Sequence, residues 1–258
     1  MATSAVVSTK VVSQREWLAA RKKLLKKEKE LTHLRDALTA ERLALPWVRM
    51  EQPYVFDTPE GKKSLAELFE GHSQLAVYHF MFGPDWKQGC SSCSMAADGF
   101  DAVSHHLAAR DVRLVAVSRA PLAEIQPFQK RMGWRFPWAS SNGNSFNRDF
   151  RVSFTKEEIA AGENYNFGTF DFPMEEAPGL SFFYKDASGE VFHTYSTFGR
   201  GLDEILGVYY FLDRAPKGRD EENLPRPMAW VRHHDRYESR VAAPDTKGSD
   251  VCCHQANQ

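Results

Sequence analysis

Cysteine is scarce in this sequence, with four residues among 258. A small secreted protein held together by disulfides would carry a much higher proportion, so that class is excluded and reduced thiols in the cytoplasm are expected. The sequence has no apolar run of the ~18–20 residues that a membrane span needs, and its first residues contain no long apolar segment typical of a secretory signal. The formal net charge of -1 argues against nucleic acid as the main partner. No glycine-rich phosphate loop or dinucleotide fingerprint is present, so no organic cofactor is expected.

The first long segment of the chain has helical character. Ser13, followed three residues later by Glu16, forms a capping-box pattern and predicts that a helix starts there. Mixed basic and acidic charges indicate a solvated helix face. The apolar face of this segment can pack on the rest of the chain or on a second copy, so a homodimer is one expectation. Apolar residues recur mainly at spacings of three, four and seven as far as Leu43, namely Trp17, Leu18, Leu24, Leu25, Leu31, Leu34 and Leu38.

The middle of the sequence predicts alternating strands and helices. Leu75–Phe82 and Asp111–Val117 are apolar runs of strand length, which is typical of strands buried on both faces. Residues 180–185 and 190–195 flank Asp-Ala-Ser-Gly, which predicts a β-hairpin. The other predicted elements are strands at Tyr54–Phe56 and Phe136–Ser140, helices after Cys93 and from Pro121, a short helix at Ser64–Phe69, a helix capped by Thr155, and a helix at Asp203–Asp213.

This order of elements predicts an α/β, thioredoxin-like fold. A central mixed sheet would be flanked by helices, because the strand–helix–strand part implies a parallel pair and the hairpin adds antiparallel edges. An extra N-terminal helix and a long insertion before the final β-hairpin would distinguish this chain. We expect an N-terminal helical arm over 1–46, a thioredoxin-like domain over 47–214, and a C-terminal extension over 215–258 with a disordered tail.

Cys90 and Cys93 lie between the first buried strand and the helix that follows it. On this fold, Cys-x-x-Cys at the start of a helix is a redox motif, because free N–H groups at the helix N-terminus stabilise the nucleophilic thiolate. The sequence therefore predicts a thiol–disulfide oxidoreductase. Cys90 would attack a protein or small-molecule disulfide, Cys93 would resolve the mixed disulfide, and a thiol reductant would reset the pair.

Two further residues are candidates for contact with the substrate. Pro178 precedes the apolar strand that begins at Leu180, which is the place where thioredoxin-like proteins usually carry a cis proline. Gly179 intervenes, so an ordinary trans proline is the alternative. Trp86 precedes Cys90 by four residues, whereas thioredoxins place a Trp immediately before the first cysteine.

Three stretches also resemble a bacterial thioredoxin-like family, a domain of unknown function. They are GCSSCS, VFHTYSTFGRGLDEILGVYYFLD and WVRHHDRY, and the resemblance extends from the N-terminal helix to about Tyr237. It implies a thioredoxin-like fold and places Cys90 and Cys93 at the thioredoxin-type positions. It implies no substrate, and no role for His193, Tyr195 or Arg200.

Several alternatives remain open at the level of sequence. A zinc or copper site could use Cys90 and Cys93 with His193, because thiolates favour these ions. A peroxiredoxin-like peroxide reductase would share the fold, but the Thr expected three residues before its cysteine is here Lys87. A third alternative is a non-catalytic interaction protein that docks through the N-terminal helix. Other motifs are expected to be structural: His105-His106 and His233-His234 at the surface, and His79 in the core. Cys252-Cys253 could deliver electrons to the main dithiol, but the composition of the tail favours a disordered segment without that role.

Overall fold

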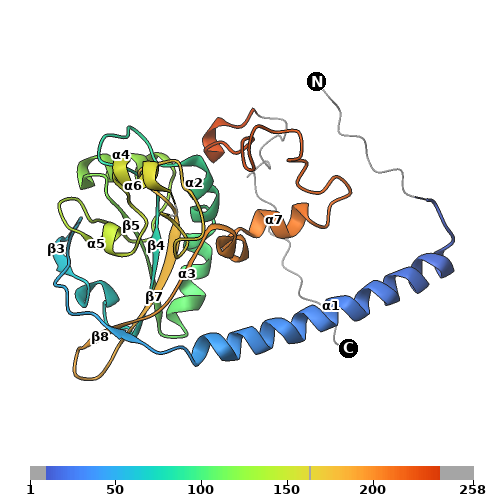
Figure 1. The fold of residues 1–258 in the computed structure, drawn as a ribbon, viewed down its shortest axis with the longest axis horizontal. Helices are drawn as coiled ribbons and strands as arrows, with labels where there is room; N and C mark the ends of the chain where they lie inside the picture. The colour runs from blue at the N-terminus through green and yellow to red at the C-terminus, as the bar shows by residue number, and fades with distance from the viewer. Residues whose placement is uncertain (1–9, 163, 239–258) are drawn as a thin grey trace, which may run out of the picture.

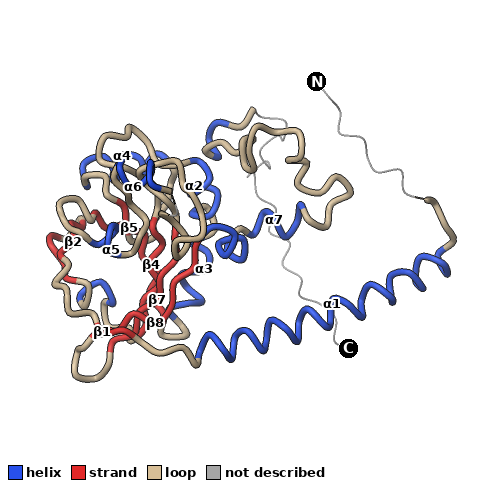
Figure 2. Tube along the Cα trace, in the orientation of Figure 1, coloured by secondary structure: helices blue, strands red, loops and turns tan. Residues whose placement is uncertain are grey.

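The computed structural model describes residues 10–162 and 164–238, and its core is a mixed sheet around the central strand β4 (Gln74–His79). β4 pairs in parallel with β5 (Val112–Ser118) and antiparallel with β7 (Gly179–Lys185), and β7 pairs antiparallel with β8 (Val191–Phe198). The order β8-β7-β4-β5 is that of a thioredoxin-like core. Figure 2 shows these strands gathered in one sheet with helices around it, so the predicted fold class is confirmed.

Shorter strands extend the sheet at both edges. β6 (Trp138–Ser140) lies parallel to β5, the hairpin of β2 (Val55–Thr58) and β3 (Gly61–Ser64) follows it, and β1 (Val48–Arg49) lies beside β8. The predicted helix at Ser64–Phe69 is wrong, because only the 3₁₀ turn η1 (Glu67–Phe69) forms. Gly61 adopts φ +117, a conformation open to glycine, and returns the chain onto β2 as β3.

Two hydrophobic clusters cover the opposite faces of β4. Tyr78 belongs to the cluster that includes Cys93 of α2 (Ser91–Ala97), Phe100 of α3 (Phe100–Ala108) and Phe128 of α4 (Leu122–Arg131). Val77 belongs to the other cluster, with residues of β2, η1 and α5 (Phe146–Asp149). Because side chains alternate along a strand, β4 is buried on both faces, as its continuous apolar sequence predicted.

The insertion and the C-terminal part form shorter elements. α6 (Lys156–Ala161) begins at Thr155 with the predicted capping box to Glu158. The helix predicted over Asp203–Asp213 is divided into the 3₁₀ helix η2 (Gly199–Ile205) and α7 (Gly207–Leu212), because Leu206 adopts ψ 73 between them. A last turn, η3 (His234–Arg236), ends the described chain.

A buried ion pair anchors the insertion to the sheet. Glu176 is 2% exposed and pairs with Arg119, which follows β5, at 2.7 Å from Oε1 to Nη1. Its second oxygen accepts a hydrogen bond from the Ser153 hydroxyl at 2.7 Å. Burial raises the pKa of Glu176, and the charge of Arg119 opposes this effect. The two segments of the insertion are thereby held at the end of the sheet that carries the dithiol.

The N-terminal helix α1 (Gln14–Leu43) is a separate rod (Figure 1). It begins as predicted, with the Ser13 hydroxyl and the Glu16 carboxylate capping each other's backbone N–H groups. None of its residues is buried. No helix among the described residues is both long enough and apolar enough to cross a bilayer.

Candidate functional site

The dithiol lies where the chain passes from β4 into α2. Cys90 is the N-cap of α2, and its backbone N–H donates to the carbonyl of Met81 at 3.0 Å. Its own carbonyl accepts hydrogen bonds from the Ser94 N–H at 2.9 Å and the Ser94 hydroxyl at 2.8 Å. Both thiols are free; Cys90 is partly exposed, whereas Cys93 is 2% exposed. The structure thus brings the two predicted residues together, with Cys90 as the more accessible sulfur.

The pKa values of the two thiols are shifted in opposite directions. A hydrogen bond from the Cys93 thiol is the main cause that lowers the pKa of Cys90 to about 6, and the backbone N–H groups of Cys93 and Ser92 and the charge of Arg226 add to it. Burial raises the pKa of Cys93 well above its usual value, and the adjacent Cys90 raises it further. At neutral pH, Cys90 is therefore the thiolate and Cys93 the thiol that supports it.

Tyr78 is a site residue that the sequence analysis missed. It projects from β4 to the face that carries Cys93, it is 2% exposed, and its hydroxyl donates a hydrogen bond to the Cys93 sulfur. Burial raises the pKa of this hydroxyl well above 10, so it remains a donor at physiological pH. A hydroxyl-bearing residue inside a strand that is otherwise apolar was the available signal.

Replacing Tyr78 with phenylalanine is expected to slow the step in which Cys93 attacks. A hydrogen bond to a charged group is worth about 1.5–3 kcal/mol, so the mixed disulfide should persist roughly ten- to a hundredfold longer. Single-turnover mass spectrometry would measure its lifetime. Tyr54→Phe is a matched control, because Tyr54 belongs to the other cluster and its hydroxyl donates to the exposed Asp149. Equal lifetimes in Tyr78→Phe and in the wild type would exclude this role.

The loop before Cys90 is held closely by its surroundings. A side chain at Gly89 would come within 2.5 Å of the Phe80 ring and 2.9 Å of the Phe128 ring. The carbonyl of Gly89 accepts a hydrogen bond from Nε2 of His233 at 2.9 Å, and the Nδ1 atom of His233 accepts one from Arg131 at 3.1 Å. The WVRHHDRY stretch therefore packs against the dithiol loop, and the role of this motif lies in its contacts with residues distant in sequence.

The two pairs of adjacent histidines were both expected at the surface, which is correct for three of the four residues and wrong for His233. His105 and His106 are exposed, as expected. His233 is 3% exposed because its ring packs on Phe128 and its nitrogen atoms are bound by Arg131 and Gly89. His234 stays exposed and pairs with Asp98.

The two candidate substrate-contact residues lie in different surroundings. The peptide bond before Pro178 is trans, as are all those in the described chain, so the cis-proline expectation is wrong. Pro178 precedes β7, and its carbonyl accepts a hydrogen bond from the buried Tyr165 hydroxyl. Trp86 is partly exposed, and its indole covers Gly83 so closely that a side chain at Gly83 would lie 2.8 Å from the ring nitrogen.

A cavity of about 1080 Å³ adjoins the dithiol end of the sheet. Tyr165 and Phe172 give it aromatic lining beside Pro178, and Arg219 and Met228 line it from the C-terminal segment. Neither cysteine lines it. Arg226, two residues before Met228, acts electrostatically on Cys90, and Met228 packs against the cluster that contains Cys93. The C-terminal segment that lines the cavity therefore continues into residues near the dithiol.

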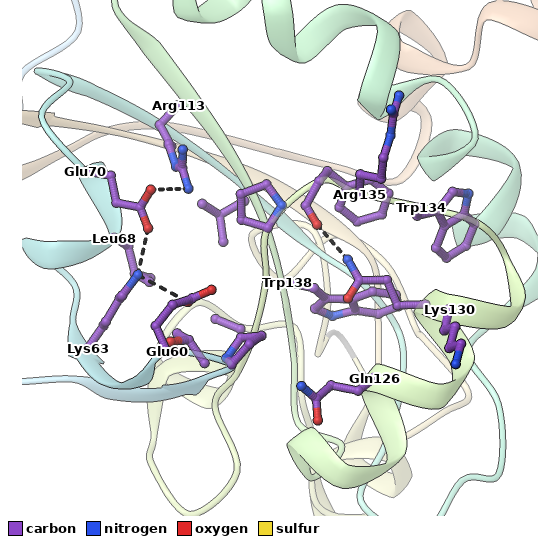
Figure 3. Close-up of a pocket in the computed structure, with 17 residues that line it drawn as sticks. Glu60, Lys63, Leu68, Glu70, Arg113, Gln126, Lys130, Trp134, Arg135 and Trp138 are labelled. Atoms are coloured by element: carbon purple, nitrogen blue, oxygen red, sulfur yellow. Dashed lines mark hydrogen bonds and ion pairs between the residues drawn. The ribbon is translucent and has the colours of Figure 1, made fainter.

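A second cavity, of about 780 Å³, lies between β3, η1, β5 and α4 (Figure 3). Glu70 lies at one side of it, where it pairs with Lys63 at 2.7 Å and with Arg113. Lys63 also pairs with Glu60 at 3.3 Å. Neither cysteine lines this cavity, so it is separate from the dithiol. Its charged residues Glu60, Lys63, Glu70 and Arg113 form ion pairs with one another.

The structure does not bring His193 to the dithiol. His193 lies opposite Phe183 on the face of the sheet that carries Val77, whereas Cys93 packs on the other face. His193 Nε2 contacts the Ser196 hydroxyl at 2.8 Å, and burial lowers its pKa. In 10–162 and 164–238, no group of three or more His, Cys, Asp or Glu side chains could hold a metal ion. The placement therefore gives no support to the metal alternative with Cys90, Cys93 and His193.

Two other predictions concern cysteines and histidines away from the dithiol. His79 is a core histidine, as expected: burial lowers its pKa to about 3, and its Nε2 contacts the Ser181 hydroxyl at 2.8 Å. Cys252 and Cys253, for which an electron relay was the less favoured interpretation, lie outside the described residues.

Comparison with known proteins identifies the family of the chain. Residues 6–237 match the family described as bacterial protein of unknown function (DUF899), which agrees with the resemblance seen in the sequence. No curated protein sequence matches the chain. Three solved structures are similar in fold. Peroxidoxin BcpB from Mycobacterium tuberculosis is 13% identical over 62% of this chain and 95% of that chain, with a TM-score of 0.41, and Peroxiredoxin Q from Xanthomonas campestris is 14% identical over 65% and 96%, with a TM-score of 0.42. A protein described as thiol:disulfide interchange protein DsbE from Chlorobium tepidum is 13% identical over 64% of this chain and 98% of that chain, with a TM-score of 0.39.

Proposed function

The chain belongs to the bacterial family of unknown function DUF899, and we propose that this member is a thiol–disulfide oxidoreductase that works through Cys90 and Cys93. One observation carries the proposal: the two sulfurs of a Cys-x-x-Cys pair differ in exposure and acidity. Cys90 is partly exposed with a lowered pKa, and Cys93 is buried with a raised pKa. This asymmetry suits an attacking and a resolving thiol.

The reaction proceeds in two exchanges. The Cys90 thiolate attacks one sulfur of the substrate disulfide, so that a Cys90–substrate disulfide forms and the other substrate sulfur leaves as a thiolate. Cys93 then loses its proton and attacks the Cys90 sulfur, which forms the Cys90–Cys93 disulfide and releases the second substrate thiolate. The substrate gains two electrons and the dithiol loses two. A thiol reductant, such as glutathione or another dithiol protein, returns them.

The site's own residues assist at each stage. The backbone N–H groups of Ser92 and Cys93 stabilise the Cys90 thiolate, and the Tyr78 hydroxyl stabilises charge on Cys93 as it attacks. The cavity beside Pro178 gives the substrate an aromatic wall, and Trp86 offers a second exposed contact. Reduced thiols are needed for this cycle, so we place it in the cytoplasm.

A thiol titration over a series of glutathione potentials tests this proposal. Mass spectrometry of the Cys90–Cys93 peptide should show one reversible two-electron step, at a potential in the cytosolic range of roughly -220 to -320 mV. Metal-free protein is used, and the metal content of the purified protein is measured beside it. If no disulfide forms between these sulfurs, and zinc or copper occupies both thiols in stoichiometric amount, the redox function is wrong.

A further inference from the structure

The apolar residues of α1 have no partner within the described chain. Although α1 is 30 residues long, none of its residues is buried. Seven large apolar side chains are between 40% and 56% exposed: Trp17, Leu18, Leu24, Leu25, Leu31, Leu34 and Leu38. A helix of this length gains most of its stability from packing an apolar face, so these residues indicate a surface that something covers.

The other described residues, 44–162 and 164–238, do not cover this face. Glu28 and Arg35 line a hollow of about 630 Å³ between α1 and the segment formed by η2 and α7. Near the end of α1, the Arg42 guanidinium lies over the Tyr195 ring, 4.9 Å from its centroid. Figure 1 shows that the remainder of the rod extends away from the sheet. The helix is tied to the domain at its C-terminal end and leaves its leucines free.

The apolar residues follow a seven-residue repeat. Trp17, Leu24, Leu31 and Leu38 are each seven residues apart, and with these at position a of a heptad, Ala20 and Leu34 fall at position d. A strict seven-residue repeat differs from the 3.6-residue period of a straight helix, and it favours a left-handed supercoil of two helices.

The charges beside this seam fit a second copy of the same helix. In a parallel pair, each g residue faces the e residue five positions later on the partner. Glu16 then faces the partner's Arg21, Lys23 faces the partner's Glu28, and Glu30 faces the partner's Arg35. Each of the three pairs joins an acidic and a basic side chain, and each occurs twice in the dimer because of its two-fold symmetry.

An antiparallel pair is less favourable. That arrangement places e residues opposite e residues, and three of the four e positions in α1 are arginines, namely Arg21, Arg35 and Arg42. Like charges would then face one another along the seam. We propose that α1 is a dimerisation helix that pairs in parallel with α1 of a second copy of this chain, which places both thioredoxin-like domains at the C-terminal end of the paired helices.

Two charged d positions make this dimer weaker than an ideal coiled coil. Lys27 lies between Leu24 and Leu31, Glu41 occupies the last d position of α1, and a charged residue in the seam lowers stability while it restricts register. The dimer should therefore dissociate on dilution. Lys27→Leu should tighten it by about tenfold or more, equivalent to about 1.4 kcal/mol.

Analytical ultracentrifugation of the full chain over a wide concentration range tests the proposal. We expect a reversible dimer in the wild type, a tighter dimer in Lys27→Leu, and a monomer in Leu31→Asp, with circular dichroism to confirm that the domain is folded. Glu30→Lys should weaken the dimer by about tenfold, and adding Arg35→Glu should restore it, because the pair is then reversed. Wild type and Lys27→Leu that both stay monomeric, or a Leu31→Asp variant that stays dimeric, would overturn the proposal.

The orientation has its own measurement. A chain whose four native cysteines are serines receives Leu38→Cys and is oxidised. In a parallel pair the two introduced sulfurs meet and form an intermolecular disulfide. In an antiparallel pair with aligned seams, residue 38 faces residue 20 of the partner, and the two sulfurs lie about 27 Å apart along the axis. A dimer that fails to cross-link at residue 38 would rule out the parallel arrangement.

Discussion

Replacing Cys90 with serine is expected to abolish disulfide reduction, whereas Cys93→Ser should trap the substrate on Cys90. A serine hydroxyl at position 90 cannot form the mixed disulfide, so turnover should fall by about a thousandfold or more. Cys93→Ser keeps the attacking thiolate and lacks the sulfur that resolves it. Its expected product is a stable adduct with the mass of the protein plus half of the substrate. An insulin-reduction assay and intact mass spectrometry measure the two effects.

The matched control for these variants is the double replacement Cys252→Ser and Cys253→Ser. It removes two thiols from the tail and leaves the Cys90–Cys93 pair unchanged, so at least half of the activity should remain. Full activity in Cys90→Ser, or an adduct located on Cys93 in the wild type, would show that the roles of the two sulfurs are assigned wrongly. Loss of activity in the tail variant would make these cysteines part of the cycle.

The difference between Cys90 and Cys93 arises from the fold. Cys90 is the N-cap of α2, where the N–H groups of Ser92 and Cys93 have no helical acceptor and are free for the sulfur. One turn later, Cys93 points into the cluster beneath β4, where burial outweighs the hydrogen bonds that the Tyr78 hydroxyl and the Met81 backbone offer to its sulfur. Two identical side chains therefore acquire different acidities from their place on one helical turn.

Features that depend on near neighbours could be predicted from the sequence. The capping box at Ser13 and the one at Thr155 are confirmed, because each rests on a residue three positions away. The buried strand before the dithiol is confirmed for the same reason, since its apolar run is continuous. The predicted helix at Ser64–Phe69 was wrong: Ser64 pairs with Val55 in the β2–β3 hairpin, which leaves only the 3₁₀ turn at Glu67–Phe69.

Features that depend on distant contacts could not be predicted. His233 was expected at the surface, yet it bonds the carbonyl of Gly89, which lies 144 residues earlier. Tyr78 lies 15 residues before Cys93, and a single hydroxyl in an apolar strand does not reveal its acceptor. Arg119 and Glu176 are 57 residues apart in the chain. In each case the interaction becomes visible only when the topology places the two segments together.

Replacing Arg119 with methionine is expected to destabilise the fold strongly, because it removes one partner of a buried ion pair. Methionine keeps much of the volume but leaves the Glu176 carboxylate with the Ser153 hydroxyl as its remaining side-chain partner. Breaking a buried ion pair by removing one partner costs about 3–5 kcal/mol, and the partial exposure of Arg119 favours the lower end. Urea denaturation measures the free energy of unfolding. The matched control is Arg135→Met, whose pair with Asp101 is exposed and should contribute about 1 kcal/mol or less.

The pH dependence of the stability lost in Arg119→Met shows whether the ion pair or the packing of the side chain is responsible. Burial already raises the pKa of Glu176 above its unfolded value, so the folded state holds the proton more tightly and stability falls as pH rises through that range. Without Arg119 the pKa rises further, and the penalty for an ionised Glu176 grows. The loss of stability in Arg119→Met should therefore be larger at neutral pH than at about pH 5. Adding Glu176→Gln should recover much of the lost stability, because the buried charge is gone. A loss of stability that is equal at both pH values and unaffected by Glu176→Gln would assign the effect to packing alone.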